Sequence, residues 1–490
     1  MGINVRDKEK PKQLKSTPRQ PKQKPKQLKS TPRQLKQLKS TPRQLKQPKQ
    51  LKLSNGIRII IVPLNTKLTY ISTHYLLGRN QERSHEAGLT HYCEHLLGSL
   101  TSQKYKSSAY VSEEIYKRGG DFNAFVTDYE MGIYIKGLYD DLEFYMDLLS
   151  NTINNFYIEK DAKIKEKGAI IQEYMGNISN NNYAFEYNIY KFLYPKYSYL
   201  ADYKKQIKLL KGFGDRTVRA YIKKHLNTDN LLITITCPTL KVGETIKNVK
   251  KYFGVIKYKK TTSAYPVIKH SNTCLKIVNI RNAVSDKNNS LIIHLPKRIE
   301  YLSEEYLILY YYINRILFNF DTGIFYKILR KKLGIIYNIG LTVNVDSNNP
   351  DMSCYYITSK CHSKYTTLFI ENFLTILQSY EMEDERILNA SRYFKYQYES
   401  RKFYNLNSLN DEYKDQLLFS KKIFTSKEIY QKLLSIKPAQ IKAYYKNTFV
   451  KDILSRHILF YYSNKNITNA IASLYTKHMP GVECKKYNIS

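Results

Sequence analysis

A recurring order of predicted strands and helices most constrains the fold of this 490-residue chain. Two short apolar runs, residues 57–63 and 69–78, predict a pair of neighbouring strands, and long helical patterns follow them. After about residue 272 the chain begins again with two apolar runs, CLKIVNI and SLIIHLP, and a helical pattern at 303–320. Strands mixed with long helices in this order favour α+β units, each layered around its own core.

Further elements follow from local patterns of the same kind. SSAYVSEEIYKRGG (107–120) predicts an amphipathic helix that stops at the glycine pair. In the first half, the other expected elements are a helix from about Gly88, strands DFNAFV and MGIYIKGL, helices near 139–154, 158–180 and 243–253, and a strand at 230–236. In the second half, we expect a helix ending near Leu333, strands IIYNIGLTVNV and SCYYITSK, largely helical residues after 363, and a late strand in ILSRHILFYYS.

The first 50 residues differ from the rest, because PKQLKSTPRQ recurs there with a period of about ten residues. A segment rich in Lys, Gln and Pro with few apolar residues cannot bury enough surface to fold, which predicts a disordered tail. The predicted organisation is a tail at 1–50, a first domain at 51–260 and a second domain at 261–490. The tail is either a weak polyanion-binding segment or a neutral expansion of a simple repeat.

The formal net charge of +37 extends beyond this tail. A basic body attracts nucleic acid, acidic peptides or anionic lipid. Compositional drift is the simpler interpretation, since 46 Tyr, no Trp and many Lys residues are typical of an AT-rich genome. Nucleic-acid binding therefore rests only on the tail and the net charge.

Six scattered cysteines form no close C-x-x-C pair, which favours a reducing compartment. No apolar run approaches the roughly 18 residues of a membrane span, and no signal peptide is evident. We therefore expect a cytoplasmic protein without a membrane partner.

The motif H-x-x-E-H occurs as His91, Glu94 and His95 within GLTHYCEHLLG. In a helix the two histidines lie at i and i+4 on one face, where both imidazoles can point at a common ion. Glu94 lies beside them, so its carboxylate can reach water on that ion. This is the inverted form of the zincin motif. The alternative is a chance match on an amphipathic helix.

A catalytic zinc ion takes three protein ligands and keeps one position open for water. The predicted helix at 158–180 carries Glu166 and Glu173, seven residues apart and hence on one face. Glu173 follows His95 by 78 residues. The alternative for this glutamate pair is a solvated helix face.

At these residues the chain resembles the pitrilysin and insulinase-type metallopeptidases, the inverzincins, whose H-x-x-E-H is followed roughly 75 residues later by E-x6-E. The resemblance implies that His91, His95 and Glu173 bind Zn²⁺. It also implies that Glu94 is the general base. Glu166 would be a supporting carboxylate.

Two more motifs extend the resemblance. Residues 119–125, GGDFNAF, match the family's edge strand, which implies that Asn123 and Ala124 pair with the substrate backbone. Arg330 and Tyr337 match the family's R-x6-Y, which implies a grip on a peptide carbonyl and an oxyanion hydrogen bond. The alternatives are an asparagine in an ordinary turn, a solvated arginine and a core tyrosine.

Two positions depart from the family's pattern or add to it. The segment TDYE (127–130) is displaced by one residue from the family's T-S-x-E, so we assign no role to Glu130. Cys93 lies inside the motif, where it either packs in the core or makes the protein sensitive to alkylation.

The resemblance implies two tandem α/β-sandwich domains of the metallopeptidase type, similar to mitochondrial processing peptidase. Four such units enclose a chamber in relatives, which implies a homodimer or heterodimer. The implied function is zinc-dependent hydrolysis of peptides or extended polypeptide segments. The alternative is a non-catalytic subunit of a processing complex, or a scaffold, with the same fold.

Overall fold

The computed structural model describes residues 47–180, 182–260, 274–281, 287–346, 352–400, 406–419 and 422–489. The predicted tail lies outside the described residues as far as residue 46. Its last two residues, Lys49 and Gln50, instead belong to strand β1. The predicted domain boundary after residue 260 also falls at a segment outside the described residues.

Strands from residues 49–238 form one six-stranded sheet in the order β1-β2-β6-β3-β5-β4. The pair β2 and β6 is parallel, and the other neighbours are antiparallel. The strands are β1 (Lys49–Lys52), β2 (Arg58–Leu64), β3 (Leu68–Tyr75), β4 (Asp121–Val126), β5 (Met131–Leu138) and β6 (Leu231–Pro238).

The expected pairing of the first two predicted strands is wrong, because β6 lies between β2 and β3. Every residue of β6 except Pro238 is buried. A strand that is apolar and buried on both faces belongs in the middle of a sheet. Local patterns locate each strand, but they do not reveal an insertion by a segment that starts 156 residues after β3 ends.

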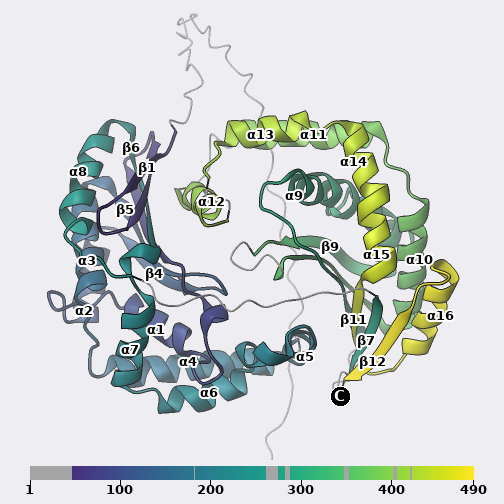
Figure 1. Ribbon diagram of the computed structural model, residues 1–490, viewed down its shortest axis with the longest axis horizontal. Coiled ribbons are helices and arrows are strands. Elements are labelled where there is room, and N and C mark those ends of the chain that lie inside the picture. The colour runs from purple at the N-terminus through teal and green to yellow at the C-terminus, as the bar shows by residue number, and fades with distance from the viewer. Residues whose placement is uncertain are drawn as a thin grey trace, which may run out of the picture. The chain divides into compact units, whose positions relative to one another are not determined.

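Helices α3 and α8 pack on this sheet (Figure 1), and the predicted helices at 107–120 and 158–180 are confirmed. The segment from α5 to α7 was not predicted as helical. The helices are α1 (Leu89–Gly98), α2 (Ser108–Lys117), α3 (Leu142–Asn154), α4 (Ala162–Ser179), α5 (Tyr183–Leu193), α6 (Tyr203–Gly212), α7 (Asp215–His225) and α8 (Val242–Phe253). Short 3-10 segments are η1 (Arg79–Gln81), η2 (Tyr139–Asp141), η3 (Pro195–Leu200), η4 (Thr228–Asn230) and η5 (Thr239–Lys241).

The second half forms another six-stranded sheet, in the order β12-β7-β11-β8-β10-β9. Its strands are β7 (Leu275–Arg281), β8 (Asn288–Pro296), β9 (Ile336–Asn344), β10 (Cys354–His362), β11 (Ile458–Ser463) and β12 (Cys484–Ile489). Its helices are α9 (Glu304–Leu307), the π-type η6 (Ile308–Phe318) and η7 (Tyr326–Lys332), the 3-10 segment η9 (Ser363–Tyr365), α10 (Thr366–Ser379), α11 (Asp384–Ser400), α12 (Leu406–Phe419), α13 (Ser426–Ser435), α14 (Pro438–Tyr444), the π-type η11 (Tyr445–Val450), α15 (Lys451–Arg456) and α16 (Thr468–His478).

The two sheets share one plan. In each, a late strand, β6 or β11, lies between the first two long strands, parallel to the first and antiparallel to the second. Each sheet packs its helix-covered face into a separate large apolar core. The outermost strand next to the first long strand differs between the sheets. In the chain, β1 comes before the other strands of its sheet, whereas β12 comes after the other strands of its sheet. The predicted α+β character and the repeated plan are confirmed.

One helix from each half also packs against the sheet of the other half. In β2, Ile59 and Ile61 face the core of the first half, whereas Ile60 and Val62 face the opposite side and pack near Tyr413 of α12. Conversely, Phe185 of α5 packs on the face of β7 and β11 that lies opposite the core of the second half. Alternation along the strands therefore gives each sheet two buried faces.

An ion pair anchors α12 where it meets the first half. Lys414 Nζ lies 2.6 Å from Glu130 Oε1, and Glu130 Oε2 lies 3.0 Å from His74 Nδ1. The nearby basic groups, His74 first, hold the pKa of the Glu130 carboxyl down at about 2 despite its burial. Glu130 therefore has a structural role in this contact.

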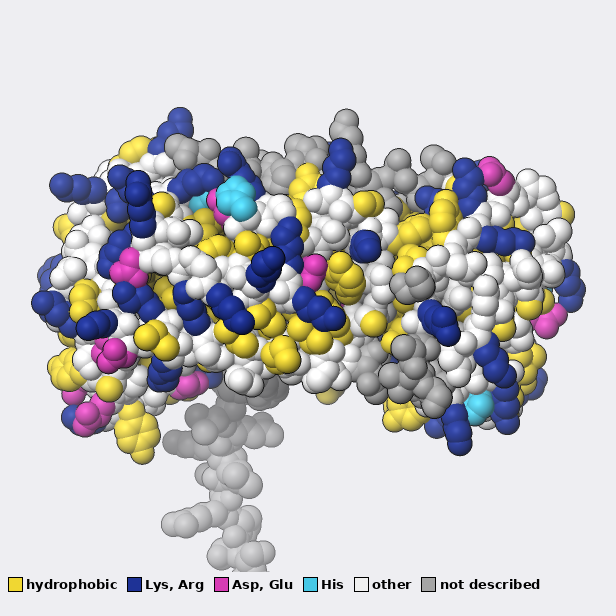
Figure 2. All heavy atoms as spheres, turned by 90° about the horizontal axis from the view of Figure 1, so that it is seen from below, with side chains coloured by type: hydrophobic (Ala, Val, Ile, Leu, Met, Phe, Trp, Pro, Cys, Tyr) yellow, Lys and Arg dark blue, Asp and Glu magenta, His cyan; other side chains and the backbone are white. Residues whose placement is uncertain are grey.

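Lysine and arginine side chains are spread over the face drawn in Figure 2 and do not gather in one patch there. Apolar side chains lie between them. None of the helices in the described part of the chain is long and apolar enough to cross a membrane.

Candidate metal centre

Helix α1, which carries the motif, begins with an unusual cap. Gly88 has a φ of +89°, a left-handed conformation that favours glycine. The carboxylate of Glu82 accepts hydrogen bonds from the backbone N–H groups of Gly88 at 2.9 Å and Thr90 at 2.7 Å. Burial raises the pKa of Glu82 to about 7. Sequence reasoning missed Glu82, because a capping side chain six residues before the N-cap Gly88 matches no local capping pattern.

The two motif histidines and Glu173 converge. His91 Nε2 lies 3.4 Å from Glu173 Oε2, and His95 Nε2 lies 3.9 Å from the same oxygen. The imidazole centroids are 4.9 Å apart. The i, i+4 spacing on α1 and the position of Glu173 on α4 thus bring the three predicted ligands together.

The Nδ1 atom of each motif histidine is hydrogen-bonded to a side chain of α4. His95 Nδ1 lies 2.9 Å from Glu166 Oε2, and His91 Nδ1 lies 2.9 Å from the hydroxyl of Tyr174. Such partners set the orientation of a ligating imidazole and leave Nε2 for the metal. Glu166 therefore lies where the resemblance implies. Sequence reasoning missed Tyr174, for which the only signal is its position directly after Glu173.

Glu94 completes the cluster from α1 itself. Its Oε2 lies 3.8 Å from His91 Nε2 and 3.9 Å from His95 Nε2, and the residue is 9% exposed. Burial raises the pKa of Glu94 to about 7, while burial and His95 lower the pKa of His91 to about 3. A neutral imidazole is the form that binds a metal ion. A carboxyl group that titrates near neutrality suits a general base.

The donor chemistry matches a zinc site. Among the described residues, one group of three metal-type side chains has all its ligand atoms within 4.8 Å of one another, namely His91, Glu94 and His95. Two imidazole nitrogens with one carboxylate are a common catalytic zinc set. The Glu173 side chain is half exposed, so its carboxylate would be free to approach an ion held by the two imidazoles. Glu94 would then remain beside that ion.

Cys93 is fully buried, and burial raises the pKa of its thiol. A buried thiol of this kind is unreactive. The structure therefore favours packing over sensitivity to alkylation.

Asn123 and Ala124 lie on β4, the outermost strand at its end of the first sheet. Within the described residues β4 pairs only with β5, and β4 packs beside the motif helix α1. The Ala124 N–H donates to the Asn123 side chain at 2.9 Å. The motif is thus part of an edge strand and not an ordinary turn.

Arg330 and Tyr337 lie apart from the metal-type cluster. Arg330 donates to the carbonyl of Ile336 at 3.1 Å, and its guanidinium lies 5.5 Å from the Tyr337 ring centroid. Both line a pocket of about 400 Å³ whose other lining residues, apart from Asn182, belong to the second half. Tyr337 is 70% exposed, which excludes a core tyrosine. Across the residues that the structure describes, no hydrogen bond or ion pair joins either side chain to the histidines or Glu173.

The fold and the cluster define an α+β protein with an inverted zincin motif. Residues 74–197 match the family model described as insulinase (peptidase family M16), and residues 216–390 match the model described as peptidase M16 inactive domain. The chain belongs to this insulinase, or pitrilysin, family of peptidases.

Individual relatives are distant. An uncharacterized zinc protease of Rickettsia felis is 21% identical over 69% of this chain and 80% of its own length. Bovine insulin-degrading enzyme is 27% identical over 27% of this chain, a match that spans only 13% of the bovine protein. A solved peptidase M16 inactive domain from Pseudomonas fluorescens superposes with a TM-score of 0.72 at 12% identity, covering 85% of this chain and 98% of that one.

Proposed function

We propose that this chain is a zinc-dependent endopeptidase. One observation carries the proposal: Nε2 of His91 and Nε2 of His95 lie within 3.9 Å of one Glu173 oxygen, with Glu94 beside them. His91, His95 and Glu173 would hold the ion. When bound, zinc polarises a water molecule and the scissile carbonyl.

The chain's own residues supply the rest of the reaction. Glu94 Oε2 takes a proton from the attacking water and passes it to the leaving amine. Glu166 and Tyr174 keep the two imidazoles in one orientation throughout, since each holds an Nδ1 at 2.9 Å.

The substrate would be an extended peptide or unfolded segment that adds a strand to β4. Main-chain pairing at Asn123 and Ala124 holds a peptide without demanding a sequence. The Asn123 side chain would have to release the Ala124 N–H first. This requirement predicts that Asn123 adjusts on binding.

Arg330 and Tyr337 would bind the substrate at a second point, in the pocket of the second half. For Tyr337→Phe we expect kcat to fall by about 10²-fold if the hydroxyl stabilises an oxyanion. Tyr310→Phe, at another exposed tyrosine of the second half, is the control. An unchanged kcat in Tyr337→Phe would remove this role.

We also propose that two chains, identical or different, associate to enclose the substrate. This proposal rests on the family resemblance alone. Sedimentation of the purified chain tests the homodimer, and a fully active monomer would refute the need for any partner.

The central experiment compares the full chain with Glu94→Gln for zinc content and for turnover of a fluorogenic peptide. The expected result is zinc retained and kcat lowered by about 10²- to 10⁴-fold. Glu113→Gln, on the exposed face of α2, is the matched control and should keep full activity. Equal turnover in Glu94→Gln would show that Glu94 is not the base.

A non-catalytic subunit of a processing complex, or a scaffold, is the second candidate function. The description of the model matched by residues 216–390 as an inactive domain favours it. The H-x-x-E-H motif lies outside residues 216–390, in the part of the chain that matches the insulinase model. A chain that binds no zinc and cleaves no peptide would favour this second function.

A further inference from the structure

A pocket of about 190 Å³ opens between α3 and α7 and reaches the motif helix α1. Leu97 and Glu94 of α1 line it, as do Leu149 of α3 and Ile222 of α7. The Glu94 carboxylate is engaged on its imidazole side, with Oε2 3.8 Å from His91 Nε2. The pocket therefore shares Glu94 with the metal-type cluster, while the rest of its lining lies outside that cluster.

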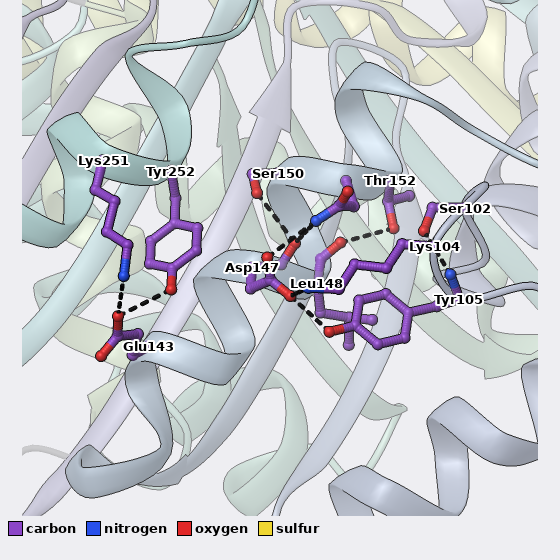
Figure 3. Close-up of polar contacts among 11 residues, drawn as sticks. Ser102, Lys104, Tyr105, Glu143, Asp147, Leu148, Ser150, Thr152, Lys251 and Tyr252 are labelled. Atoms are coloured by element: carbon purple, nitrogen blue, oxygen red, sulfur yellow. Dashed lines mark hydrogen bonds and ion pairs between the residues drawn. The ribbon is translucent and has the colours of Figure 1, made fainter.

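Most of the lining side chains inside this pocket are apolar, and its two threonine hydroxyls are bonded to backbone carbonyls. Thr152 Oγ1 donates to the carbonyl oxygen of Leu148 at 3.0 Å (Figure 3), and the carbonyl oxygen of Leu100 lies at the same distance from it. Thr73 Oγ1 donates to the carbonyl of Ile133 at 3.2 Å. Neither threonine has its hydroxyl proton free for a ligand, so an apolar chain is the occupant that suits the interior.

The helix α3 that forms one wall is firmly held. Asp147 accepts a hydrogen bond from the Tyr105 hydroxyl at 2.5 Å, and Glu143 accepts one from Lys251 of α8 at 2.6 Å (Figure 3). These contacts tie α3 to the segment after α1 and to α8. The pocket therefore has a preformed wall, which limits the entropy cost of binding.

The mouth carries only positive charge. Arg219 and Lys223 lie at i and i+4 on α7, and Lys259 belongs to the same lining; all three are exposed. Within the described ranges none of the three side chains has an ion pair or hydrogen bond. Glu94 is the one acidic residue that lines the pocket, and it is buried.

We propose that this pocket binds a medium-chain carboxylate, a fatty acid such as octanoate. Its tail would lie between α3 and α7 with its end against Leu97, and its carboxylate would lie between Arg219, Lys223 and Lys259. A cavity of about 150 Å³ holds benzene, so one of about 190 Å³ suits roughly six carbon groups. The head and its neighbouring carbon then remain at the basic mouth.

Calorimetric titration of the full chain with octanoate, below its micelle concentration, tests the proposal. We expect one octanoate per chain. Acetate, which has the head alone, and octyltrimethylammonium, which has the tail with a cationic head, should each bind at least about tenfold more weakly. No heat with octanoate together with an unchanged thermal unfolding temperature, or equal binding of the cationic analogue, would overturn the proposal.

Charge reversal at the mouth provides the second arm. The double variant Arg219→Glu, Lys223→Glu should weaken octanoate binding by at least about tenfold. Arg216→Glu, on the same helix but outside the lining, should leave it unchanged. Lys259→Glu, which lies outside any helix, replaces the double variant if that chain does not fold. Unchanged octanoate affinity in the folded mouth variant would refute the assignment, and no arm depends on peptide hydrolysis.

Discussion

In both halves, a helix that follows the second long strand packs on a later helix, but the two pairs differ in chemistry. In the first half α1 packs on α4 and brings His91 and His95 to Glu173. In the second half η6 packs on α11, where the Tyr312 and Phe394 rings have centroids 5.1 Å apart. The same packing thus encloses an ionisable cluster in one half and an aromatic contact in the other.

The difference teaches what each helix pair contributes. Burial raises the pKa of Glu94 and lowers the pKa of His91, which favours the neutral form of each group. Burying these ionisable side chains therefore costs folding free energy when no cation is bound. The second pair buries apolar rings, which stabilises the fold directly. One plan therefore separates a helix pair suited to chemistry from a helix pair suited to stability.

The largest expected effect follows removal of a ligand from the first pair. Glu173→Ala should lower zinc affinity by more than about 100-fold, the upper range for mere supporting groups, and abolish turnover. Metal titration of the chain checks this result. Glu186→Ala on α5 is the control and should keep its zinc. Retained zinc in Glu173→Ala would place the third ligand elsewhere.

The second pair should respond in stability and not in metal binding. Phe394→Ala leaves a cavity beside Tyr312 and should lower the free energy of unfolding by about 3–5 kcal/mol. Tyr396→Ala, 67% exposed on the same helix, should change it by less than about 0.5 kcal/mol. Denaturant unfolding measures both. A zinc affinity reduced in Phe394→Ala as strongly as in Glu173→Ala would show that the pairs are coupled.

The N-terminal caps of α1 and of α9, the helix that leads into η6, also differ, because one is ionisable and the other is neutral. Glu82 caps α1 with a carboxylate, whereas Ser303 caps α9 with a hydroxyl that accepts from the Tyr306 N–H at 3.2 Å. The folded pKa of Glu82, about 7, lies above the ordinary value of 4.5, so the folded chain binds more protons between these pH values. Its contribution to stability is present below pH 4.5 and is lost as the pH rises through 7.

Unfolding measured from pH 4.5 to 7 therefore distinguishes the two caps. Glu82→Gln should remove a pH-dependent change on the order of 2 kcal/mol. Ser303→Ala should cost about 1 kcal/mol at every pH. Identical slopes in the wild-type chain and Glu82→Gln would contradict the raised pKa.

Smaller effects on zinc affinity than that of Glu173→Ala come from the groups that contact Nδ1 of the two imidazoles. Glu166→Gln and Tyr174→Phe should each lower zinc affinity by about 10- to 100-fold, because they free Nδ1 of His95 and His91. Gln172→Ala, exposed on the same helix, should have no effect. If both variants keep full zinc affinity, their hydrogen bonds serve only packing.

Sequence patterns predicted most elements because strand and helix periods are local properties. They also predicted the convergence of His91, His95 and Glu173, the first two from helical spacing and the third from the family resemblance. Contacts between distant segments were not predictable in this way. The insertion of β6 and the cap by Glu82 both depend on the folded chain bringing separate segments together.

The exchange of helices between the halves has a consequence for synthesis on the ribosome. The first sheet is complete at Pro238, but its second face waits for α12, which starts at Leu406. At about 5–20 residues per second, that delay lasts roughly ten to thirty seconds. During this interval the nascent chain exposes Ile60 and Val62, so chaperones that capture newly made apolar surfaces should hold this protein longer than one whose halves fold independently.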